Sequence, residues 1–407
     1  MGNIALQTGK LEEAQDFFQK SLLLEKKSGQ EKGAIFSDNN FGLVLALQGK
    51  FDAAGRFFKE RIRQVSKERV LDQISLHSGL GFALIQASQF NEAIKILQKA
   101  KELAEKAGVL SVQFSILGNL VTALLKEGRY AEGLQFLKEL GAMQARFGSR
   151  RDIAFNLLRQ GDVSMILGMG EGARESFEKG RKIAAEIDEQ NLLLWFQLME
   201  SYWERIFGRP EEARKRLEDL VRQARSARDI TLVTWGQYGL ADLFAELGKK
   251  EEGLKALEKI TNDLPDEEFM ARKKLVEGRL LDFSKAAVKP KEFFEPLEKI
   301  CLDNHFYELL WEVYYAWGTA EQSAGDAKRG AKFLAKGAEL LKELSGALPE
   351  EYRDRYLSQR ERQRLMQAWE ESNGSTQEKR VAGKIVSDDR RGPKSTATMT
   401  SPLKKKR

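Results

Sequence analysis

The sequence has very few of the residues that build metal sites and covalent catalytic centres. Its 407 residues include one cysteine, Cys301, and two histidines, His77 and His305. A single cysteine excludes an intrachain disulfide, and the three residues do not have the spacing of a zinc site. We therefore expect no catalytic residues, no metal site and no cofactor, and we do not expect an enzyme.

The sequence also lacks a hydrophobic run long enough to cross a membrane. Its longest apolar stretch runs from Phe41 to Leu47, whereas a membrane-spanning helix needs about 20 such residues. The first ten residues lack the charged and then apolar pattern of a secretion signal. These absences predict no membrane contact and a cytoplasmic location.

Proline is scarce, and so are strand signals. The chain has seven prolines, with 42% apolar and 31% charged residues, and its abundant Leu, Ala, Glu, Lys and Gln favour helices. This composition predicts an all-α protein.

A glycine-rich stretch from Gly168 to Ala173 superficially resembles a phosphate-binding loop. It follows a helical pattern rather than a strand, and no glycine-rich loop ends in Lys-Ser or Lys-Thr. We interpret the stretch as a turn between helices, and nucleotide hydrolysis has no support in the sequence.

The positive charge is concentrated at one end of the chain. The formal net charge is +6, but residues 374–407 alone carry ten Lys or Arg against three acids, so residues 1–373 are close to neutral. This polar segment is predicted to be a disordered basic tail. Its last residues, SPLKKKR, fit a nuclear-import signal, a tether to an acidic surface or a nucleic-acid arm, or simply a solvated tail. Nucleic acid is expected to bind, if at all, only through this tail.

A turn motif recurs along the chain at a nearly constant spacing. Its copies centre near residues 9, 49, 88, 128, 168, 208, 248, 288 and 325, at spacings of 40, 39, 40, 40, 40, 40, 40 and 37. Self-similarity at such a period indicates a solenoid. We expect an α-solenoid of about eight and a half helix-turn-helix repeats over residues 1–345, with capping helices over 346–373.

Each copy places small and large residues at fixed distances from its turn. A small residue stands five positions after the turn, as in Ala54 and Ala213, and a large apolar residue nine positions after it, as in Phe58. Glycines such as Gly42 and Gly161 recur seven positions before it. Small residues let two helices approach closely, so these positions predict the contact faces of each hairpin.

The copy NNFGLVLALQGKFDAAGRFF, residues 39–58, resembles the tetratricopeptide repeat (TPR). It carries the Leu-Gly-like pair as Phe41 and Gly42, the turn glycine as Gly49, and the small and aromatic positions of the second helix as Ala54 and Phe58. The 40-residue period is similar to the long-repeat class of kinesin light chains and bacterial signalling scaffolds. The resemblance implies a right-handed superhelix that acts as a non-enzymatic interaction scaffold, with a peptide or protein partner bound in its concave groove.

The first copy is incomplete, because only Met1 to Thr8 precede its turn. An incomplete first hairpin would expose a face on which another segment docks. It also motivates an alternative function, the sensory or regulatory arm of a larger bacterial signalling protein linked to a kinase or ATPase. The binding partner and the oligomeric state do not follow from the sequence.

Counting back from each turn predicts which side chains face the groove. The middle copies place aromatic and charged residues there, namely Trp195, Tyr202, Arg205, Trp235, Tyr238, Asp242 and Tyr315. Such a surface suits the anchoring of a peptide, with Arg205 pairing an acidic group of the ligand. The same rings could instead pack as core between helices.

Overall fold

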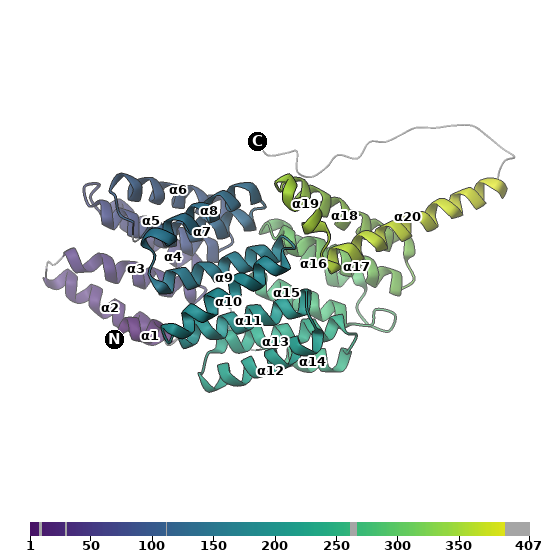
Figure 1. The fold of residues 1–407 in the computed structure, drawn as a ribbon, viewed down its shortest axis with the longest axis horizontal. Coiled ribbons are helices and arrows are strands. Elements are labelled where there is room, and N and C mark those ends of the chain that lie inside the picture. Colours follow the sequence, from purple (N-terminus) through teal and green to yellow (C-terminus); the bar gives the residue numbers. More distant parts are fainter. Residues whose placement is uncertain (8–9, 29–30, 111, 261–266, 387–407) are drawn as a thin grey trace.

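The computed structural model describes residues 1–386 except 8–9, 29–30, 111 and 261–266. The fold is an all-α solenoid, as the sequence predicted. Successive helices stack side by side along a curved array (Figure 1).

The described residues form nine helical hairpins followed by two further helices. The hairpins pair α1 (Gly2–Gln7) with α2 (Leu11–Ser28), α3 (Glu31–Leu47) with α4 (Phe51–Gln64), α5 (Val70–Gln86) with α6 (Phe90–Lys106), α7 (Gln113–Lys126) with α8 (Tyr130–Phe147), α9 (Arg150–Ile166) with α10 (Gly170–Glu186), α11 (Gln190–Ile206) with α12 (Pro210–Ser226), α13 (Ile230–Glu246) with α14 (Lys250–Glu258), α15 (Glu267–Leu280) with α16 (Pro290–Asp303), and α17 (Tyr307–Ser323) with α18 (Ala327–Gly346). The further helices are α19 (Glu350–Leu357) and α20 (Arg360–Val386).

The recurring glycines of the first helices receive the large side chains of the second helices. A methyl group added at Gly161 would overlap the ring of Phe177, and one at Gly42 would overlap the ring of Phe58. Ala213, at the small position of its hairpin, is fully buried. Because each contact joins residues of one repeat, the same packing recurs along the array.

The hairpin of α15 and α16 departs from this pattern at its small position. Phe293 stands at the position that is small in other repeats, and it is buried against Gly278 of α15. Gly278 lies ten residues before the turn near 288, whereas the recurring glycines lie seven residues before theirs. Pro290 occupies the first turn of α16, where its missing N–H leaves no intrahelical hydrogen bond unmade.

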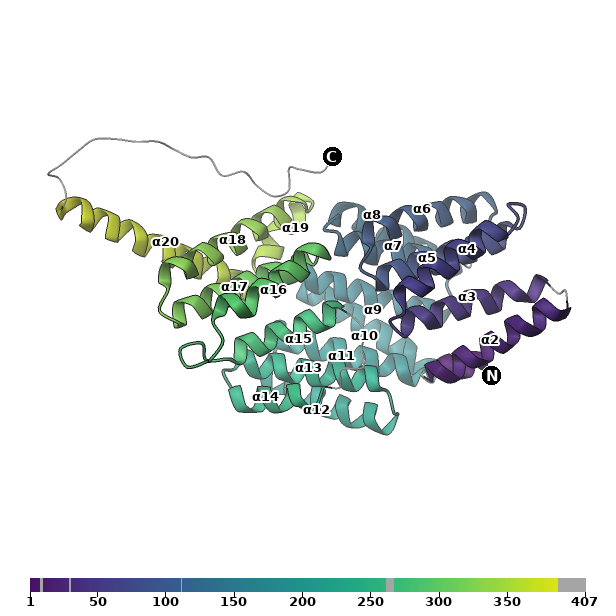
Figure 2. The same ribbon diagram turned by 180° about the vertical axis from the view of Figure 1, so that it is seen from behind.

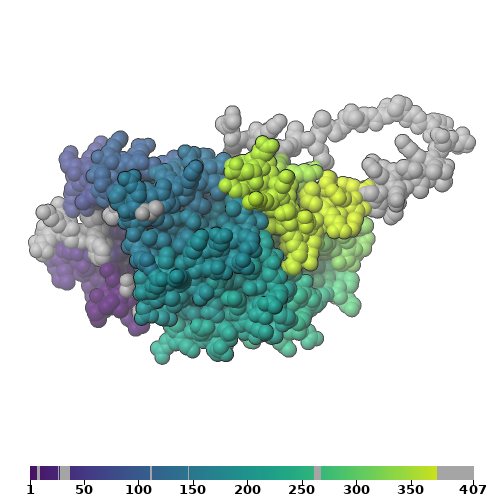
Figure 3. All heavy atoms as spheres, viewed as in Figure 1, coloured from purple at the N-terminus to yellow at the C-terminus, as the bar shows by residue number. Residues whose placement is uncertain are grey.

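The C-terminal helices turn back onto the middle of the array. The carbonyl oxygen of Arg355, just before the end of α19, packs against Gly168, and Arg362 of α20 donates a hydrogen bond of 2.8 Å to the carbonyl oxygen of Ile166 in α9. Figure 2 shows α19 beside α8, and Figure 3 shows the yellow-green C-terminal atoms lying against the teal surface. Leu365 also packs against Gly337 of α18. α19 and α20 therefore contact both the last hairpin and a repeat far away in sequence.

Helix α20 extends to Val386, past residue 373 where the sequence suggested that a disordered tail begins. The remainder of that predicted tail, residues 387–407, lies outside the described residues. Among the helices of the described chain, none is long and apolar enough to cross a membrane.

Candidate functional site

The first helices of the middle and C-terminal repeats surround a cavity of about 660 Å³. Side chains of α7, α9, α11, α13, α15 and α17 form its wall, and the beginning of α20 lies across it. All seven residues that the sequence placed in the groove line this one cavity: Trp195, Tyr202, Arg205, Trp235, Tyr238, Asp242 and Tyr315.

The aromatic residues belong partly to the core and partly to the cavity wall. Tyr238 is only 8% exposed, and it contacts the rings of Trp235 and Phe269 edge to face at 5.7 and 5.8 Å between centroids. Trp195, Tyr202, Trp235 and Tyr315 are half-buried, so each keeps a face or edge toward the cavity. Tyr238 thus fits the core interpretation, whereas the four half-buried rings fit the groove interpretation.

Arg205 already has acidic partners within the chain. Its guanidinium lies 3.2 Å from Asp242 and 3.4 Å from Glu246. Burial disfavours its charge, but the two carboxylates outweigh burial and raise the pKa of Arg205 above its usual value. Burial likewise acts to raise the pKa of Asp242, and Arg205 and Arg279 outweigh it and lower that pKa. Arg205 is therefore held in an internal ion pair, which the sequence did not predict.

Charged side chains that the sequence analysis did not select make up most of the polar wall. Eight Lys or Arg and seven Asp or Glu line the cavity. Glu268 binds both Lys126 and Arg272, Asp242 binds Arg279 as well as Arg205, and Glu246 binds Arg360. Apart from Glu268 with Arg272, which lie on one helix, these pairs join different helices, so the wall is a cross-linked network.

Helix α20 closes one side of the cavity through Arg362. This buried guanidinium lies 3.1 Å from Glu308 of α17 and 3.5 Å from the centre of the Tyr356 ring. Glu308 also accepts hydrogen bonds from Tyr130, from Tyr356 at 2.9 Å and from Trp311 at 3.1 Å. Burial acts to raise the pKa of Glu308, but Arg362 and these donors outweigh it and lower that pKa.

Three charged groups of the wall differ from the rest. Within the described part of the chain, Arg159, Asp162 and Glu312 form no ion pair within 4.0 Å and no hydrogen bond. The other seven cations and five acids of the wall are all paired.

Glu312 lies on α17, among charges from three other helices. Burial raises its pKa to about 7. Arg272 and Arg279 of α15 and Arg205 of α11 oppose this shift, and Asp242 of α13 adds to it. Glu312 therefore changes its ionisation near neutral pH.

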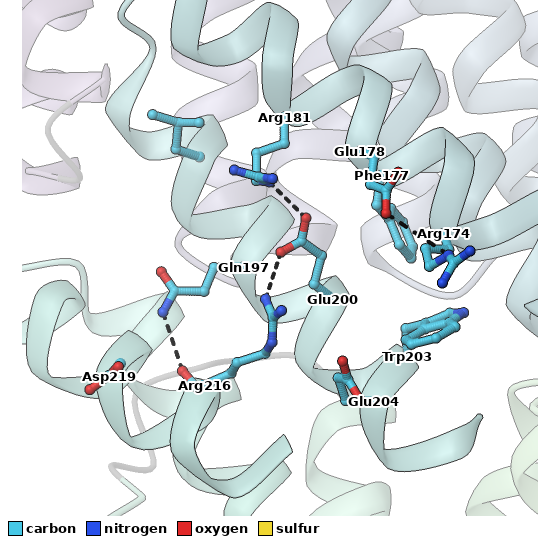
Figure 4. A pocket seen from close by; sticks show the side chains of 11 residues that line it. Arg174, Phe177, Glu178, Arg181, Gln197, Glu200, Trp203, Glu204, Arg216 and Asp219 are labelled. Carbon is cyan, nitrogen blue, oxygen red and sulfur yellow. Dashed lines mark hydrogen bonds and ion pairs between the residues drawn. The ribbon is translucent and has the colours of Figure 1, made fainter. Parts of the chain in front are cut away.

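A second cavity, of about 690 Å³, lies among α10, α11 and α12 (Figure 4). Its central acid, Glu200, binds Arg181 and Arg216, both at 2.9 Å. The indole N–H of Trp203 donates to the carbonyl oxygen of Gly170 at 2.6 Å. Because these polar groups already bond to one another, this cavity has fewer groups left to bind a ligand than the central cavity has.

The count back from each turn also places one of these charged residues, Asp162, on the groove face. Asp162 stands six residues before its turn, the register of Tyr202 and Asp242, and Arg159 lies one helical turn earlier on the same face. Arg272 and Arg279 belong to the irregular α15 repeat, where the count fails. Arg360 and Arg362 reach the cavity only because α20 folds back.

No metal site was found among the described residues, in the sense of three or more His, Cys, Asp or Glu side chains grouped to hold an ion. Cys301 is buried, and burial raises the pKa of its thiol to about 12, which keeps it protonated.

A family model described as a tetratricopeptide repeat matches residues 1–28. This match covers one repeat, and together with the observed fold it supports a likeness to TPR proteins. The 40-residue repeat class stays a prediction. A comparison with curated proteins returned no match.

Solved structures with similar folds include a Rap protein complexed with Competence and Sporulation Factor. It is 10% identical, covers 85% of this chain and 97% of that chain, and has a TM-score of 0.60. The human IFIT1 dimer with m7Gppp-AAAA is 18% identical over 83% of this chain and 80% of that chain, with a TM-score of 0.43. Yeast Tom70 is 10% identical over 95% of this chain and 91% of that chain, with a TM-score of 0.35. Of these three, the Rap protein is the one whose TM-score is high enough to show a shared fold.

Proposed function

We propose that this chain is a non-enzymatic scaffold that binds a short peptide, or an extended segment of a partner protein, in the central cavity. The observation that carries the proposal is the convergence of seven sequence-predicted groove residues on one cavity wall. Half-buried aromatic rings with a few polar groups are typical of peptide anchoring surfaces.

The size and charge of the cavity favour a small ligand of mixed character. A volume of about 660 Å³ falls within the usual range of ligand cavities, about 300–1,000 Å³, and suits a peptide of a few residues. Eight cations face seven acids, so the wall is nearly neutral. A long polyanion such as nucleic acid would meet seven carboxylates there.

The fold likeness is consistent with this use. The similar Rap protein structure is a complex with Competence and Sporulation Factor, so a solenoid of this kind can hold a bound factor. We also infer that the repeats belong to the long, 40-residue class and that the protein works in the cytoplasm.

Selection from a random heptapeptide library on the full chain tests the proposal. We expect enriched peptides whose affinity, measured by isothermal titration calorimetry, falls when Trp195 is changed to Ala. Arg174→Gln, in the second cavity, is the control and should leave the affinity unchanged. The proposal fails if no peptide binds, or if Arg174→Gln weakens binding as much as Trp195→Ala does.

A further inference from the structure

The charge pairing of the cavity wall is nearly complete, and its exceptions are informative. Within the residues that the structure describes, Arg159 is the one of the eight wall cations that has no ion-pair partner. Asp162 and Glu312 are the two of the seven wall acids that have none. An arginine presents five N–H donors, and those of the half-buried Arg159 side chain lie at the cavity wall without an acceptor from the described residues. Ligand groups that enter the cavity could accept hydrogen bonds from these donors.

The Arg159 guanidinium contacts the neighbouring helix. Its guanidinium lies against Gly118 of α7, where any larger residue would overlap it. Burial lowers the pKa of Arg159, with Asp162 acting in the opposite direction. The side chain thus lies at the cavity wall, and within the described residues its charge has no ion-pair partner.

Asp162 follows Arg159 by three residues on the same face of α9. Side chains at this spacing lie about 5–6 Å apart at their Cβ atoms and commonly form ion pairs, yet these two do not. Asp162 is exposed to the space of the cavity. The nearby cations Lys126 and Arg272 are both bound to Glu268, so neither is available to it.

We propose that Arg159 and Asp162 read the charges of the ligand, and that the groove binds a short peptide with an acidic and a basic group separated by at most one residue. The inference rests on the peptide-binding function proposed above. The Cβ spacing of the pair matches neighbouring charges on an extended peptide, whose residues advance by about 3.3–3.6 Å each. The acidic group bonds the Arg159 guanidinium and the basic group bonds the Asp162 carboxylate.

The two charges together narrow the choice of ligand. A purely anionic ligand would satisfy Arg159 but face Asp162 and Glu312, which have no cation of their own. A purely cationic ligand would satisfy the acids and leave Arg159 unpaired. A peptide that carries both signs satisfies the two groups of α9 at once.

The test uses the full chain and the random heptapeptide library as the probe. Enriched peptides should combine Lys or Arg with Asp or Glu at neighbouring or next-but-one positions. Arg159→Gln and Asp162→Asn should each weaken an enriched peptide by tenfold or more, as expected when one partner of a desolvated charge pair is lost. Arg174→Gln, outside the groove, should leave its affinity unchanged.

Two further measurements assign the effect to the proposed contacts. Replacing the acidic residue of the peptide by its amide should lower the affinity for the unaltered chain. The same replacement should change the affinity for the Arg159→Gln variant little, because the contact is already lost there. Gly118→Ala displaces the guanidinium without removing it. This variant should also bind the acidic peptide more weakly, while its affinity for the amide peptide should stay unchanged. Unchanged far-UV circular dichroism shows that each variant is folded.

The outcomes separate this inference from the proposed function. Tight peptides without the charge pair, or charged peptides indifferent to both α9 variants, would overturn the charge-reading role and leave peptide binding intact. A library that yields no binder overturns both. A random single-stranded oligonucleotide that competes with the enriched peptide for the cavity also overturns the inference.

Discussion

Arg362 of α20 and Glu308 of α17 lie 3.1 Å apart, and together they fasten the end of the chain to its middle. The same guanidinium donates to the carbonyl oxygens of Ile166 and Tyr356, at 2.8 and 2.9 Å. Glu308 is at the same time the acceptor for Tyr130 of α8. One ion pair therefore connects three parts of the solenoid and forms one wall of the cavity.

Loss of this pair should loosen the C-terminal helices. Arg362→Ala leaves the Glu308 carboxylate without its charge partner, and we expect a loss of about 3 kcal/mol or more in unfolding free energy by urea denaturation. Hydrogen exchange at the start of α20 should become faster. Arg364→Ala is the control, since Arg364 is 44% exposed and pairs with Glu361 on its own helix; its effect should stay below about 1 kcal/mol. Equal effects of the two variants would contradict the fastening role.

Two glycine substitutions distinguish a helix contact from an open helix surface. Gly161→Ala pushes a methyl group into Phe177, and we expect it to destabilise the protein by about 1–3 kcal/mol. Gly55, in α4, has no atom within 4 Å of the added methyl group. Gly55→Ala should therefore stabilise by roughly 0.5–1 kcal/mol, because alanine favours the helix. Urea midpoints that move in the same direction for both would refute the packing described here.

The aromatic set should divide into core and ligand-contacting members. Tyr238→Ala removes a ring that is 8% exposed, and we expect a stability loss of roughly 3–5 kcal/mol. Trp195→Ala removes a half-buried ring and should cost less stability, while it weakens an enriched heptapeptide by roughly 2 kcal/mol. Thermal midpoints and peptide titrations on both variants test this division. A larger stability loss for Trp195→Ala than for Tyr238→Ala would overturn it.

The raised pKa of Glu312 predicts a stability change with pH. Its carboxyl titrates near 4.5 when unfolded and at about 7 when folded, so folding favours the protonated form. The resulting destabilisation is nearly absent below pH 4.5, grows as the pH rises between the two values and is complete above pH 7. Glu312→Gln removes it, so the variant should gain on the order of 1–3 kcal/mol over the unaltered chain at pH 8 and little at pH 4.5.

Urea denaturation at the two pH values measures this difference without any ligand. Glu361→Gln is a suitable control, because Glu361 already pairs with Arg364 at 2.6 Å. A gain for Glu312→Gln that is equal at pH 4.5 and pH 8 would contradict the assignment of the shifted pKa to Glu312.

The sequence predicted the repeating part of the fold because its determinants are local. Gly161 and Phe177 lie in one hairpin, so their spacing is visible as a period along the chain. Phe293 broke that period, because it stands at the small position of its hairpin and is accommodated by Gly278, which lies outside the recurring glycine register.

The closure of the cavity was not predictable from the sequence in this way. The contacts of Glu308 with Tyr130 and of Arg362 with Ile166 join positions far apart in the chain. These contacts depend on the small rotation between successive repeats, added up over many repeats. A repeat motif does not predict the size of that rotation. The ion pair of Arg205 with Glu246 likewise required the geometry of two neighbouring repeats.

The most direct test of the account is to fill the cavity without altering its charges. Ala245 lies on its wall, so Ala245→Trp would occupy the space of the ligand, whereas Ala227→Trp adds the same bulk at an exposed helix end. Calorimetric titration of an enriched heptapeptide should show binding abolished in Ala245→Trp and retained in Ala227→Trp, with similar circular dichroism for both. Full affinity in a folded Ala245→Trp variant would show that the cavity is not the binding site.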